Sequence, residues 1–289
     1  MNFETPLENA LQRHLTEDAV PSNLRAAIRY SLMAPGKRIR PRLCMAAGKM
    51  LDVTESASIS FALALEMIHC FTLIHDDLPC MDDDDFRRGK PSNHKIFGES
   101  LALLAGDALM ALALDCAMEA SDHSPAAGFH RALKYLLQAS GPRGVIGGQA
   151  AEALLNEDST LADLRRMHAG KTGALFNAAL LVPMALAEIS GDSIDGKTIV
   201  GFASELGLAF QVADDLDDAE SEKDDSGNFA PTSVLRHQSA EQAARLTHAA
   251  LSDASQALST RWGDRAGPLC EIANEVLRSL TSHFQPVKK

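Results

Sequence analysis

Two clusters of aspartate, about 140 residues apart, restrict what this 289-residue chain can fold into. The first, DDLPCMDDDD, covers residues 76–85, and the second, DDLDD, covers residues 214–218. Carboxylates this dense repel one another, so a folded chain tolerates them mainly by binding cations or by solvating them fully. The segments that precede them, FALALEMIHCFTLIH and IVGFASELGLAFQVA, are too apolar to be solvated helix faces. An apolar helix with an acidic tip therefore predicts bound metal.

Helical spacing runs through almost the whole chain, and no segment shows sustained strand alternation or an Asn-Gly hairpin signal. No linker rich in proline, glycine or serine divides it, and 46% apolar content is ample for one large core. We therefore expect an all-α, single-domain helical bundle over residues 1–289, with two acidic rims that can face each other across a central cavity. The expected helices are 3–16, 21–33, 39–51, 55–75, 93–120, 124–139, 142–155, 159–187, 194–218, 232–259 and 264–283, with breaks at Pro35-Gly36, Gly89-Lys90-Pro91, Gly141-Pro142, Gly191 and Gly227.

The net charge of −12 argues against nucleic acid or an anionic membrane as a partner. Residues 76–85 and 214–225 hold 14 of the 39 acidic residues, so much of this charge describes a site. The five cysteines form no Cys-x-x-Cys pair and are expected to be reduced, mostly core residues. The chain begins without the apolar core of a signal peptide, and residues 101–120 and 174–189 are interrupted by polar residues or proline. We expect a cytoplasmic protein without a membrane span.

The two clusters differ in spacing. Asp214 and Asp218 are four residues apart, so a helix places them on one face, with Asp215 about 100° around the axis. Asp76 and Asp82 are six apart and would diverge on a straight helix. Pro79 lies between them and predicts a helix end or bend that brings Asp82 back toward Asp76. Asp217 is expected to be solvated, and residues 83–85 to form a solvated acidic turn.

Oxygen ligands without clustered cysteine or histidine favour Mg²⁺ or Mn²⁺ over zinc. Mg²⁺ keeps many of its waters and usually bridges substrate phosphates, so two carboxylate motifs suggest a diphosphate bound through metal. Basic residues beside glycine, proline or helix starts support this prediction, because such places offer cations and free N–H groups to an anion. These basic residues lie in Gly36-Lys37-Arg38-Ile39-Arg40-Pro41, Arg87-Arg88, His94-Lys95 and Lys171.

HDDLPCMDDDDFRRGKPSNHKIFGE resembles the first aspartate-rich motif of the trans-isoprenyl diphosphate synthases, the polyprenyl synthetase family, and QVADDLDD resembles their second. GKRIRP, EMIHCFTLIHDD, LLAGDAL, GGQAAE, HAGKTGALF and LAFQ also match, in the family order, so the resemblance covers about residues 25–220. The four-residue spacing inside the first motif is similar to that of bacterial short-chain enzymes, especially farnesyl diphosphate synthase.

The resemblance implies an all-helical isoprenoid-synthase fold, usually a homodimer, that condenses isopentenyl diphosphate with an allylic diphosphate and releases diphosphate. It implies metal ligation by Asp76, Asp77, Asp82, Asp214 and Asp218. It implies contacts to the allylic diphosphate from Arg87, Lys171 and Gln211, and contacts to isopentenyl diphosphate from Lys37, Arg40, His69 and Arg88. Thr172 and carbonyl groups near Lys171 would face the developing cation. The residues expected to act on the reacting groups are Asp76, Asp77, Arg87, Lys171, Thr172, Gln211, Asp214 and Asp215.

Product length is expected to depend on residues one helical turn before the first motif, where Phe71 and Thr72 stand. In similar enzymes a bulky aromatic here closes the pocket, so Phe71 favours a C15 product, with C10 next and C20 last. The alternative interpretation is that Phe71 is an ordinary core residue without influence on product length. One departure from the family pattern follows the second motif: Ala230 stands in place of a usual lysine, and Lys223 is the last lysine before Lys288.

Three other classes of protein remain as alternatives. A di-iron carboxylate bundle needs two Glu-x-x-His pairs, and only Glu66-Met67-Ile68-His69 is present. A terpene cyclase has no use for a second set of diphosphate-binding residues. A non-catalytic subunit of a heteromeric synthase is suggested only by the missing lysine, and such a subunit is expected to lose aspartates, whereas both motifs are intact here.

Overall fold

The computed structural model describes residues 3–16, 19–217, 219 and 229–282. Contacts between residues divide the chain into two compact units, each described here by itself: Met1–Met45 with Val53–Phe129, and Ala46–Asp52 with His130–Lys289. We call them the first and second units. Helices α3 (Ile39–Met50) and α7 (Ala126–Ser140) cross from one unit to the other along the chain. The prediction of a single domain stays a prediction.

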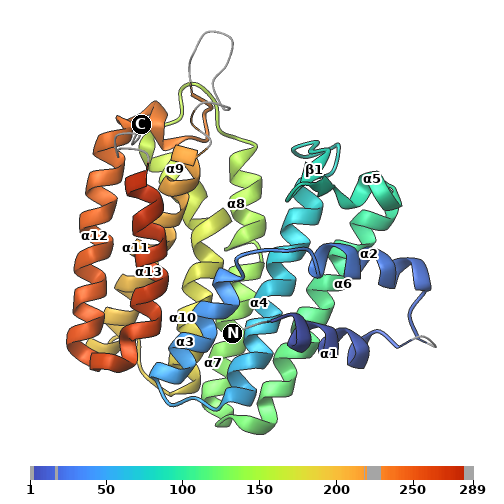
Figure 1. The fold of residues 1–289 in the computed structure, drawn as a ribbon, viewed down its shortest axis with the longest axis horizontal. Coiled ribbons are helices and arrows are strands. Elements are labelled where there is room, and N and C mark those ends of the chain that lie inside the picture. The colour runs from blue at the N-terminus through green and yellow to red at the C-terminus, as the bar shows by residue number, and fades with distance from the viewer. Residues whose placement is uncertain (1–2, 17–18, 218, 220–228, 283–289) are drawn as a thin grey trace, which may run out of the picture. The chain divides into compact units, whose positions relative to one another are not determined.

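The first unit is built around α4 (Glu55–Asp76), the helix that ends in the first aspartate motif. Thr54 caps its start by accepting the Ala57 N–H at 3.3 Å, and most of its side chains are buried, including Phe61 and Ile68. The helix α6 (Glu99–Met118) packs along it (Figure 1). The unit is completed by α1 (Glu4–His14), α2 (Ser22–Leu32), α5 (Asn93–Phe97) and the 3-10 helix η1 (Glu119–His123).

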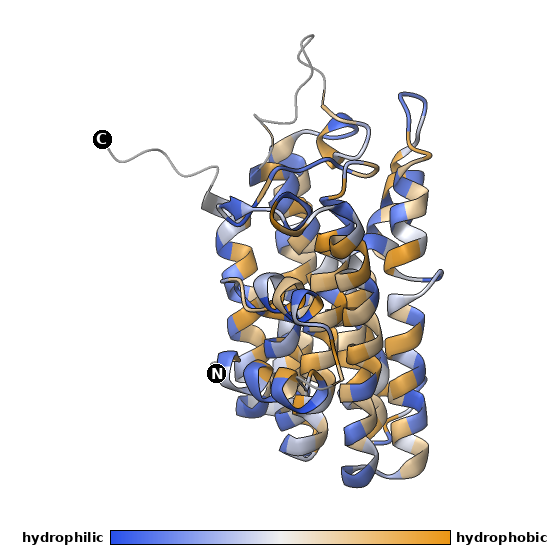
Figure 2. Ribbon diagram, turned by 90° about the vertical axis from the view of Figure 1, so that its right-hand side faces the viewer, coloured by the Kyte–Doolittle hydropathy of each residue, from blue (hydrophilic) through white to orange (hydrophobic). Residues whose placement is uncertain are grey.

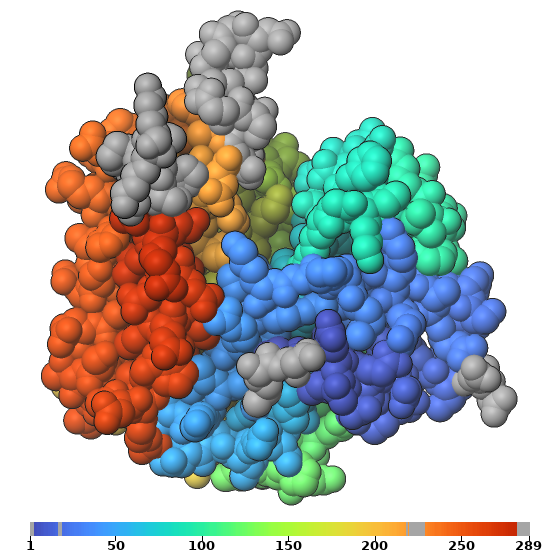
Figure 3. Space-filling model, viewed as in Figure 1, coloured from blue at the N-terminus to red at the C-terminus, as the bar shows by residue number. Residues whose placement is uncertain are grey.

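In the second unit, α11 (Ile194–Asp217) leads to the second aspartate motif and packs against α10 (Ala174–Leu186), α12 (Ala240–Trp262) and α13 (Gly267–Ser282). Orange and red surfaces mark α12 and α13 in Figure 3. Apolar residues run along the helices and share them with polar residues (Figure 2), the pattern of helices with one buried face. The remaining elements are α8 (Val145–Glu152), α9 (Leu161–His168), the π-helix η2 (Ala169–Gly173), and the 3-10 helices η3 (Val234–Arg236) and η4 (Gly263–Ala266).

Most expected helices are confirmed to within a few residues, and four differ. Gly98, at φ 83°, divides the expected helix 93–120 into α5 and α6. The helix expected over 159–187 contains the π-helical turn η2, and a 3-10 turn followed by a break precedes α12. The segment expected over 142–155 is helical only from Val145 to Glu152. The expected break at Gly227 lies outside the described residues.

The sequence analysis missed one small hairpin. Strand β1 (Phe86–Arg87) pairs antiparallel with β2 (Lys90–Pro91), and the turn uses Arg88 at φ 54° and Gly89 at φ 74°. Two consecutive positive φ angles are typical of a tight hairpin turn, but Arg-Gly is not the usual sequence for it. The hairpin and α5 lie on the surface in Figure 3, coloured teal.

By length and apolar composition alone, three helical stretches are long enough for a membrane span. They are Glu55–Asp76, Glu99–His123 and Leu161–Leu186, and 78%, 44% and 56% of their apolar windows are buried inside the protein. The first is therefore a core helix. The stretch that contains α6 leaves more than half of its window uncovered, with Leu103, Leu104 and Met118 exposed.

Candidate functional site

The first aspartate motif folds back on itself as Pro79 predicts. Helix α4 ends at Asp76, and the backbone N–H of Asp82 donates to the carbonyl oxygen of Asp76 at 2.9 Å. The turn between them is closed by a hydrogen bond from Met81 N to Leu78 O at 2.8 Å. This bend brings the backbones of two half-buried or exposed aspartates together although they are six residues apart.

Asp77, predicted as a metal ligand, has a different surrounding. Its side chain is buried, and its Oδ1 accepts a hydrogen bond from Arg87 Nε at 2.8 Å and forms an ion pair with Nη2 at 2.6 Å. Burial raises the pKa of Asp77 above its ordinary value, although Arg87 favours the charged form. Arg87 Nη2 also contacts Asp84 at 2.5 Å. The β1–β2 hairpin thus returns Arg87 to the end of α4, where two carboxylates hold its guanidinium.

His69 lines a small pocket in the first unit, which we call the cationic pocket because three arginines line it too. A cavity of about 40 Å³ is lined by His69 and by Arg38, Arg87 and Arg88. Loss of contact with water, and then the positive charge of nearby arginines, lower the pKa of His69 well below its ordinary value. These arginines are Arg40, Arg88, Arg38 and Arg87. A neutral imidazole among four guanidinium groups is an environment that suits a multiply charged anion.

Two further basic side chains that were predicted to bind a diphosphate are Lys37 and Arg88. Within the described residues, neither Lys37 nor Arg88 forms an ion pair, and both side chains are exposed. A Cβ added at Gly36 would lie 2.7 Å from Arg88 Nη1, so the guanidinium packs directly against the backbone of the GKRIRP segment. Glycine at this position therefore lets Arg88, from the hairpin, pack against the backbone of the residue that precedes Lys37.

Sequence reasoning missed Arg38 and Glu66 as a pair. Arg38, at φ 49°, donates to the carbonyl oxygens of Leu32 at 2.9 Å and Ala34 at 2.7 Å, and its Nη1 forms an ion pair with the buried Glu66. Removing one partner of such a buried pair costs about 3–5 kcal/mol. The sequence offered one signal for this pair, because Glu66 is a charged residue within the apolar run of α4 and needs a partner there. The ion pair with Arg38 accounts for a buried glutamate at position 66, so no di-iron site is needed to explain it.

Phe71 and Thr72 lie on the same helix, one turn before the motif. Phe71 is buried, with its ring centroid 5.7 Å from that of His75. Thr72 Oγ1 donates to the His69 carbonyl oxygen at 2.8 Å. His75 Nε2 reaches the Leu103 carbonyl oxygen at 3.0 Å, and a Cβ on Gly106 would lie 2.1 Å from the same nitrogen. The glycine of LLAGDAL therefore permits the close packing of α4 and α6 behind Phe71.

In the second unit a chain of hydrogen bonds joins three predicted residues. Thr172 Oγ1 donates to Gln211 Oε1 at 2.7 Å, and Gln211 Nε2 donates to Asp215 Oδ1 at 2.7 Å. The other oxygen of Asp215 accepts the Val234 N–H at 2.7 Å. Asp215 is buried, so it orients Gln211 and anchors η3. Asp214 is half-buried and Asp217 is exposed, as expected; Asp218 and Lys223 lie outside the described residues.

Lys171 and Thr172 belong to the π-helical turn η2, which carries the HAGKTG sequence. Lys171 Nζ forms an ion pair with Glu152, the last residue of GGQAAE. A Cβ on Gly148 would lie 2.0 Å from the backbone nitrogen of Lys171, so only glycine allows α8 and η2 this close. Single π-helical turns are frequent at functional sites. The pairing with Glu152 was missed, although both motifs had been recognised.

The donors in these regions fit Mg²⁺. Asp76, Asp82 and Asp214 offer carboxylate oxygens at or near the surface, and a hydrated ion needs only one or two of them. That the two acidic motifs face each other across a cavity stays a prediction.

Comparison with known proteins agrees with these features. The polyprenyl synthetase family model matches residues 21–232. The chain is 41% identical over 224 residues to farnesyl diphosphate synthase of Geobacillus stearothermophilus, covering 76% of this chain and 74% of that protein. It is 42% identical over 214 residues to geranylgeranyl pyrophosphate synthase 4 of Arabidopsis thaliana, covering 73% of this chain and 56% of that protein.

Among solved structures, a geranyltransferase from Legionella pneumophila superposes with a TM-score of 0.85 at 32% identity, over 97% of this chain and 95% of that chain. This likeness confirms the expected all-α isoprenoid-synthase fold. With the family model covering most of the chain and relatives near 40% identity, the chain belongs to the polyprenyl synthetase family, among the short-chain prenyl diphosphate synthases.

Proposed function

We propose that this protein catalyses the Mg²⁺-dependent, head-to-tail condensation of isopentenyl diphosphate with dimethylallyl or geranyl diphosphate. The main product would be farnesyl diphosphate, with release of diphosphate. The observation that supports this most is the cationic pocket, where four arginines surround a neutral His69 within the unit that carries the folded-back acidic motif. Guanidinium groups gathered around a neutral imidazole favour a phosphorylated substrate at this place.

The residues divide into two sets by their surroundings. Lys37, Arg40, His69 and Arg88 would bind isopentenyl diphosphate, since Lys37 and Arg88 have no internal counter-ion in the described part of the chain. Arg87, Lys171 and Gln211 would hold the allylic diphosphate. Asp76, Asp82, Asp214 and Asp218 would ligate Mg²⁺, and Mn²⁺ is an alternative ion. Asp77 was expected in the same set; its contacts favour a role in positioning Arg87.

The chemistry follows from charge. Mg²⁺ held by these aspartates would neutralise a diphosphate and so make it a better leaving group. Arg87 and Lys171 supply further positive charge as the allylic C–O bond breaks and its electron pair leaves with diphosphate. The double bond of isopentenyl diphosphate then attacks the allylic cation, and loss of one proton restores a double bond. Thr172 and neighbouring carbonyl oxygens would stabilise the cation, and the departing diphosphate can accept the proton.

A direct assay tests this proposal. The purified protein is incubated with Mg²⁺, labelled isopentenyl diphosphate and either dimethylallyl or geranyl diphosphate, and the dephosphorylated alcohols are sized. We expect a C15 alcohol from both starters and none without Mg²⁺. Absence of any condensed product would contradict the proposed activity and favour the non-catalytic alternative. A C10 or C20 product would contradict only the chain length.

The C15 length is supported by the buried Phe71, and relatives with farnesyl and geranylgeranyl products are similarly close. Replacing Phe71 with alanine opens space one turn before the motif, so the product should lengthen to C20. The measurement is the alcohol length from geranyl diphosphate, with Phe129→Ala, elsewhere in the same unit, as the control. An unchanged C15 product would mean that Phe71 is an ordinary core residue.

We also propose a cytoplasmic homodimer. The uncovered apolar face of α6, with Leu103, Leu104 and Met118 exposed, supports an interface, because monomers rarely expose an apolar patch of this kind. Sedimentation at micromolar concentration tests it.

Ala230, in place of a lysine, removes one potential contact to the allylic diphosphate and should raise the KM for that substrate relative to an Ala230→Lys variant.

A further inference from the structure

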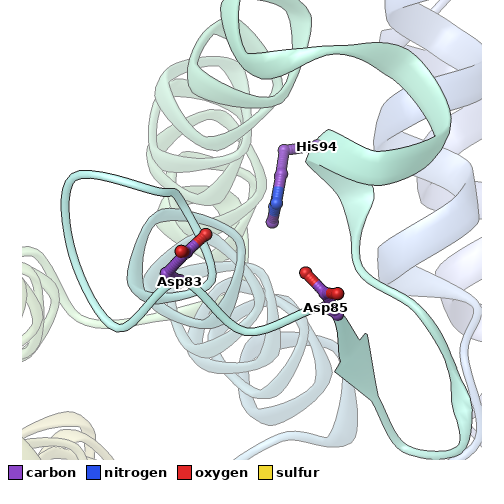
Figure 4. Close-up of side chains that lie close together, drawn as sticks. All are labelled: Asp83, Asp85 and His94. Carbon is purple, nitrogen blue, oxygen red and sulfur yellow. The ribbon is translucent and has the colours of Figure 1, made fainter.

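Two aspartates at the end of the first motif form a cluster with a histidine, and the proposed reaction uses none of the three side chains. One ligand atom each from Asp83, Asp85 and His94 lies within 4.8 Å of the other two. Figure 4 shows the imidazole of His94 directed between the two carboxylates. The two aspartates are exposed, and His94 is only 7% exposed. Exposed acidic residues often gather without a ligand, so the histidine is the informative member.

His94 has one nitrogen bonded and one left over. Its Nδ1 lies 3.1 Å from Ser92 Oγ, and Ser92 is itself buried. The other nitrogen, Nε2, is buried and has no hydrogen-bond partner among the described residues. A buried polar atom without a partner is unfavourable, and a ligand bound at Nε2 would satisfy it. When Nδ1–H donates to Ser92, Nε2 keeps a lone pair, which is the arrangement found in metal-bound histidines.

The hairpin explains how residues so far apart in sequence meet. Strands β1 and β2 lie between Asp85 and Ser92, and the Ser92 N–H donates to the Asp85 carbonyl oxygen at 2.9 Å. Helix α5 then begins with His94 in its first turn. Asp83 precedes the hairpin and has a φ of 55°.

One imidazole and two carboxylates are a mixed nitrogen and oxygen donor set. Such a set suits divalent transition ions such as Mn²⁺, Fe²⁺ or Zn²⁺, whereas Mg²⁺ prefers oxygen ligands alone. We propose that Asp83, Asp85 and His94 bind one divalent transition-metal ion in the absence of any diphosphate. This site is separate from the diphosphate-dependent Mg²⁺ ligands. It would tie the hairpin that carries Arg87 to α5.

Lys95 supplies the competing cation. Its Nζ lies 2.5 Å from Asp85 Oδ1, and Asp85 with Asp83 raises the pKa of Lys95. The ammonium therefore compensates Asp85 when no metal is present. Because a dication and this ammonium repel each other, Lys95→Met should tighten metal binding, by roughly twofold to fivefold for an exposed pair.

The test uses Mn²⁺ and the untagged full chain, without substrate or diphosphate. Electron paramagnetic resonance counts bound Mn²⁺, and electron spin echo modulation detects a coordinated imidazole nitrogen. We expect one Mn²⁺ per chain with nitrogen coupling. His94→Gln should abolish that coupling and weaken binding by at least about tenfold. Since His94 is buried, the exposed double variant Asp83→Asn/Asp85→Asn provides a second probe that preserves the core, with the same loss of affinity expected.

The matched control is Asp76→Asn, which belongs to the proposed Mg²⁺ site. It should leave substrate-free Mn²⁺ binding and its nitrogen coupling intact while abolishing turnover, so failure of this inference and failure of the proposed function are distinguishable. Absence of nitrogen coupling in the wild type would overturn the inference. So would unchanged Mn²⁺ affinity in the double variant, which would leave a cluster of solvated acidic residues with a buried histidine.

Discussion

The two motif regions differ in the charges that surround a histidine, His69 in the first unit and His168 in the second. In both, loss of contact with water lowers the pKa of a histidine. Around His69 the neighbouring charges are arginines, which lower it further. Around His168 the strongest charged neighbour is Asp215, which raises it, with Glu152 acting the same way and Lys171 opposing them. The charges that act on His69 are thus arginines, whereas those that act on His168 are two carboxylates and one lysine.

This difference indicates which side chains can gain a new ion pair or hydrogen bond when a diphosphate binds. Lys171 is paired with Glu152, and Gln211 is fixed between Thr172 and Asp215. A ligand that engages these groups must exchange existing contacts. Lys37 and Arg88, without ion-pair partners in the described part of the chain, gain a charge partner when an anion arrives. Under the proposed function, Lys37 and Arg88 would therefore gain more from binding a diphosphate than Lys171 and Gln211, which already have partners.

The strongest test of this contrast is Asp76→Ala. Under the proposed function Asp76 would help to hold Mg²⁺, so its loss should lower kcat by about a thousandfold or more, because electrostatic stabilisation is usually the largest catalytic contribution. Initial rates with saturating Mg²⁺ measure it, and Asp115→Ala, an exposed aspartate on α6, is the control. Near-normal turnover in Asp76→Ala would refute the assignment of the first motif.

Arg88→Ala should have the next largest effect. Removing one charged hydrogen-bonding group costs about 1.5–3 kcal/mol, which corresponds to a rise of roughly 10- to 150-fold in the KM for isopentenyl diphosphate. The KM for the allylic substrate should change much less. Steady-state kinetics with each substrate varied separately distinguish the two, with the exposed Arg13→Ala as the control. Equal changes in both KM values would break the division into two substrate sets.

Asp215→Asn tests the hydrogen-bonded chain that joins Thr172, Gln211 and Asp215. Both oxygens of Asp215 accept hydrogen bonds, from Gln211 and from the Val234 N–H, whereas asparagine offers one acceptor and one donor. A buried unsatisfied donor should lower the free energy of unfolding by about 1–3 kcal/mol. Urea unfolding measures this, and the exposed Asp217→Asn should change it by only a few tenths. Equal stability of the two variants would show that the hydrogen-bonded chain is not a rigid support.

The smallest expected effect concerns pH. The pKa of His69 is lowered in the folded state, so below about pH 6.5 the unfolded chain binds a proton that the folded chain does not. The free energy of unfolding should therefore be fully retained above pH 6.5 and fall by up to about 1.4 kcal/mol per pH unit below it. His69→Gln should flatten this slope, as urea titrations between about pH 5.5 and 7 would show. An unchanged slope would place the titration at His168 instead.

The sequence predicted the regular parts well because helical periodicity and Pro79 act locally. The family motifs also singled out His69, Arg87, Arg88 and Gln211, and the roles of these residues stay predictions. The sequence analysis missed what depends on contacts distant in sequence: the Arg38–Glu66 pair, the Lys171–Glu152 pair and the burial of Asp77 under Arg87. The β1–β2 hairpin was missed for a different reason, since its Arg88-Gly89 turn lacks the usual sequence signal.

The π-helical turn at Ala169–Gly173 has a consequence for how this scaffold can change. Such a turn holds one residue more than regular α-helical winding allows between α9 and α10. Deleting a single residue there would let the helix run on without interruption, and its backbone bonding would improve. The same deletion would rotate Lys171 and Thr172 about 100° around the axis, away from Glu152 and Gln211. Selection for heat resistance alone would therefore favour this deletion, which should raise the thermal stability of the protein and abolish its activity.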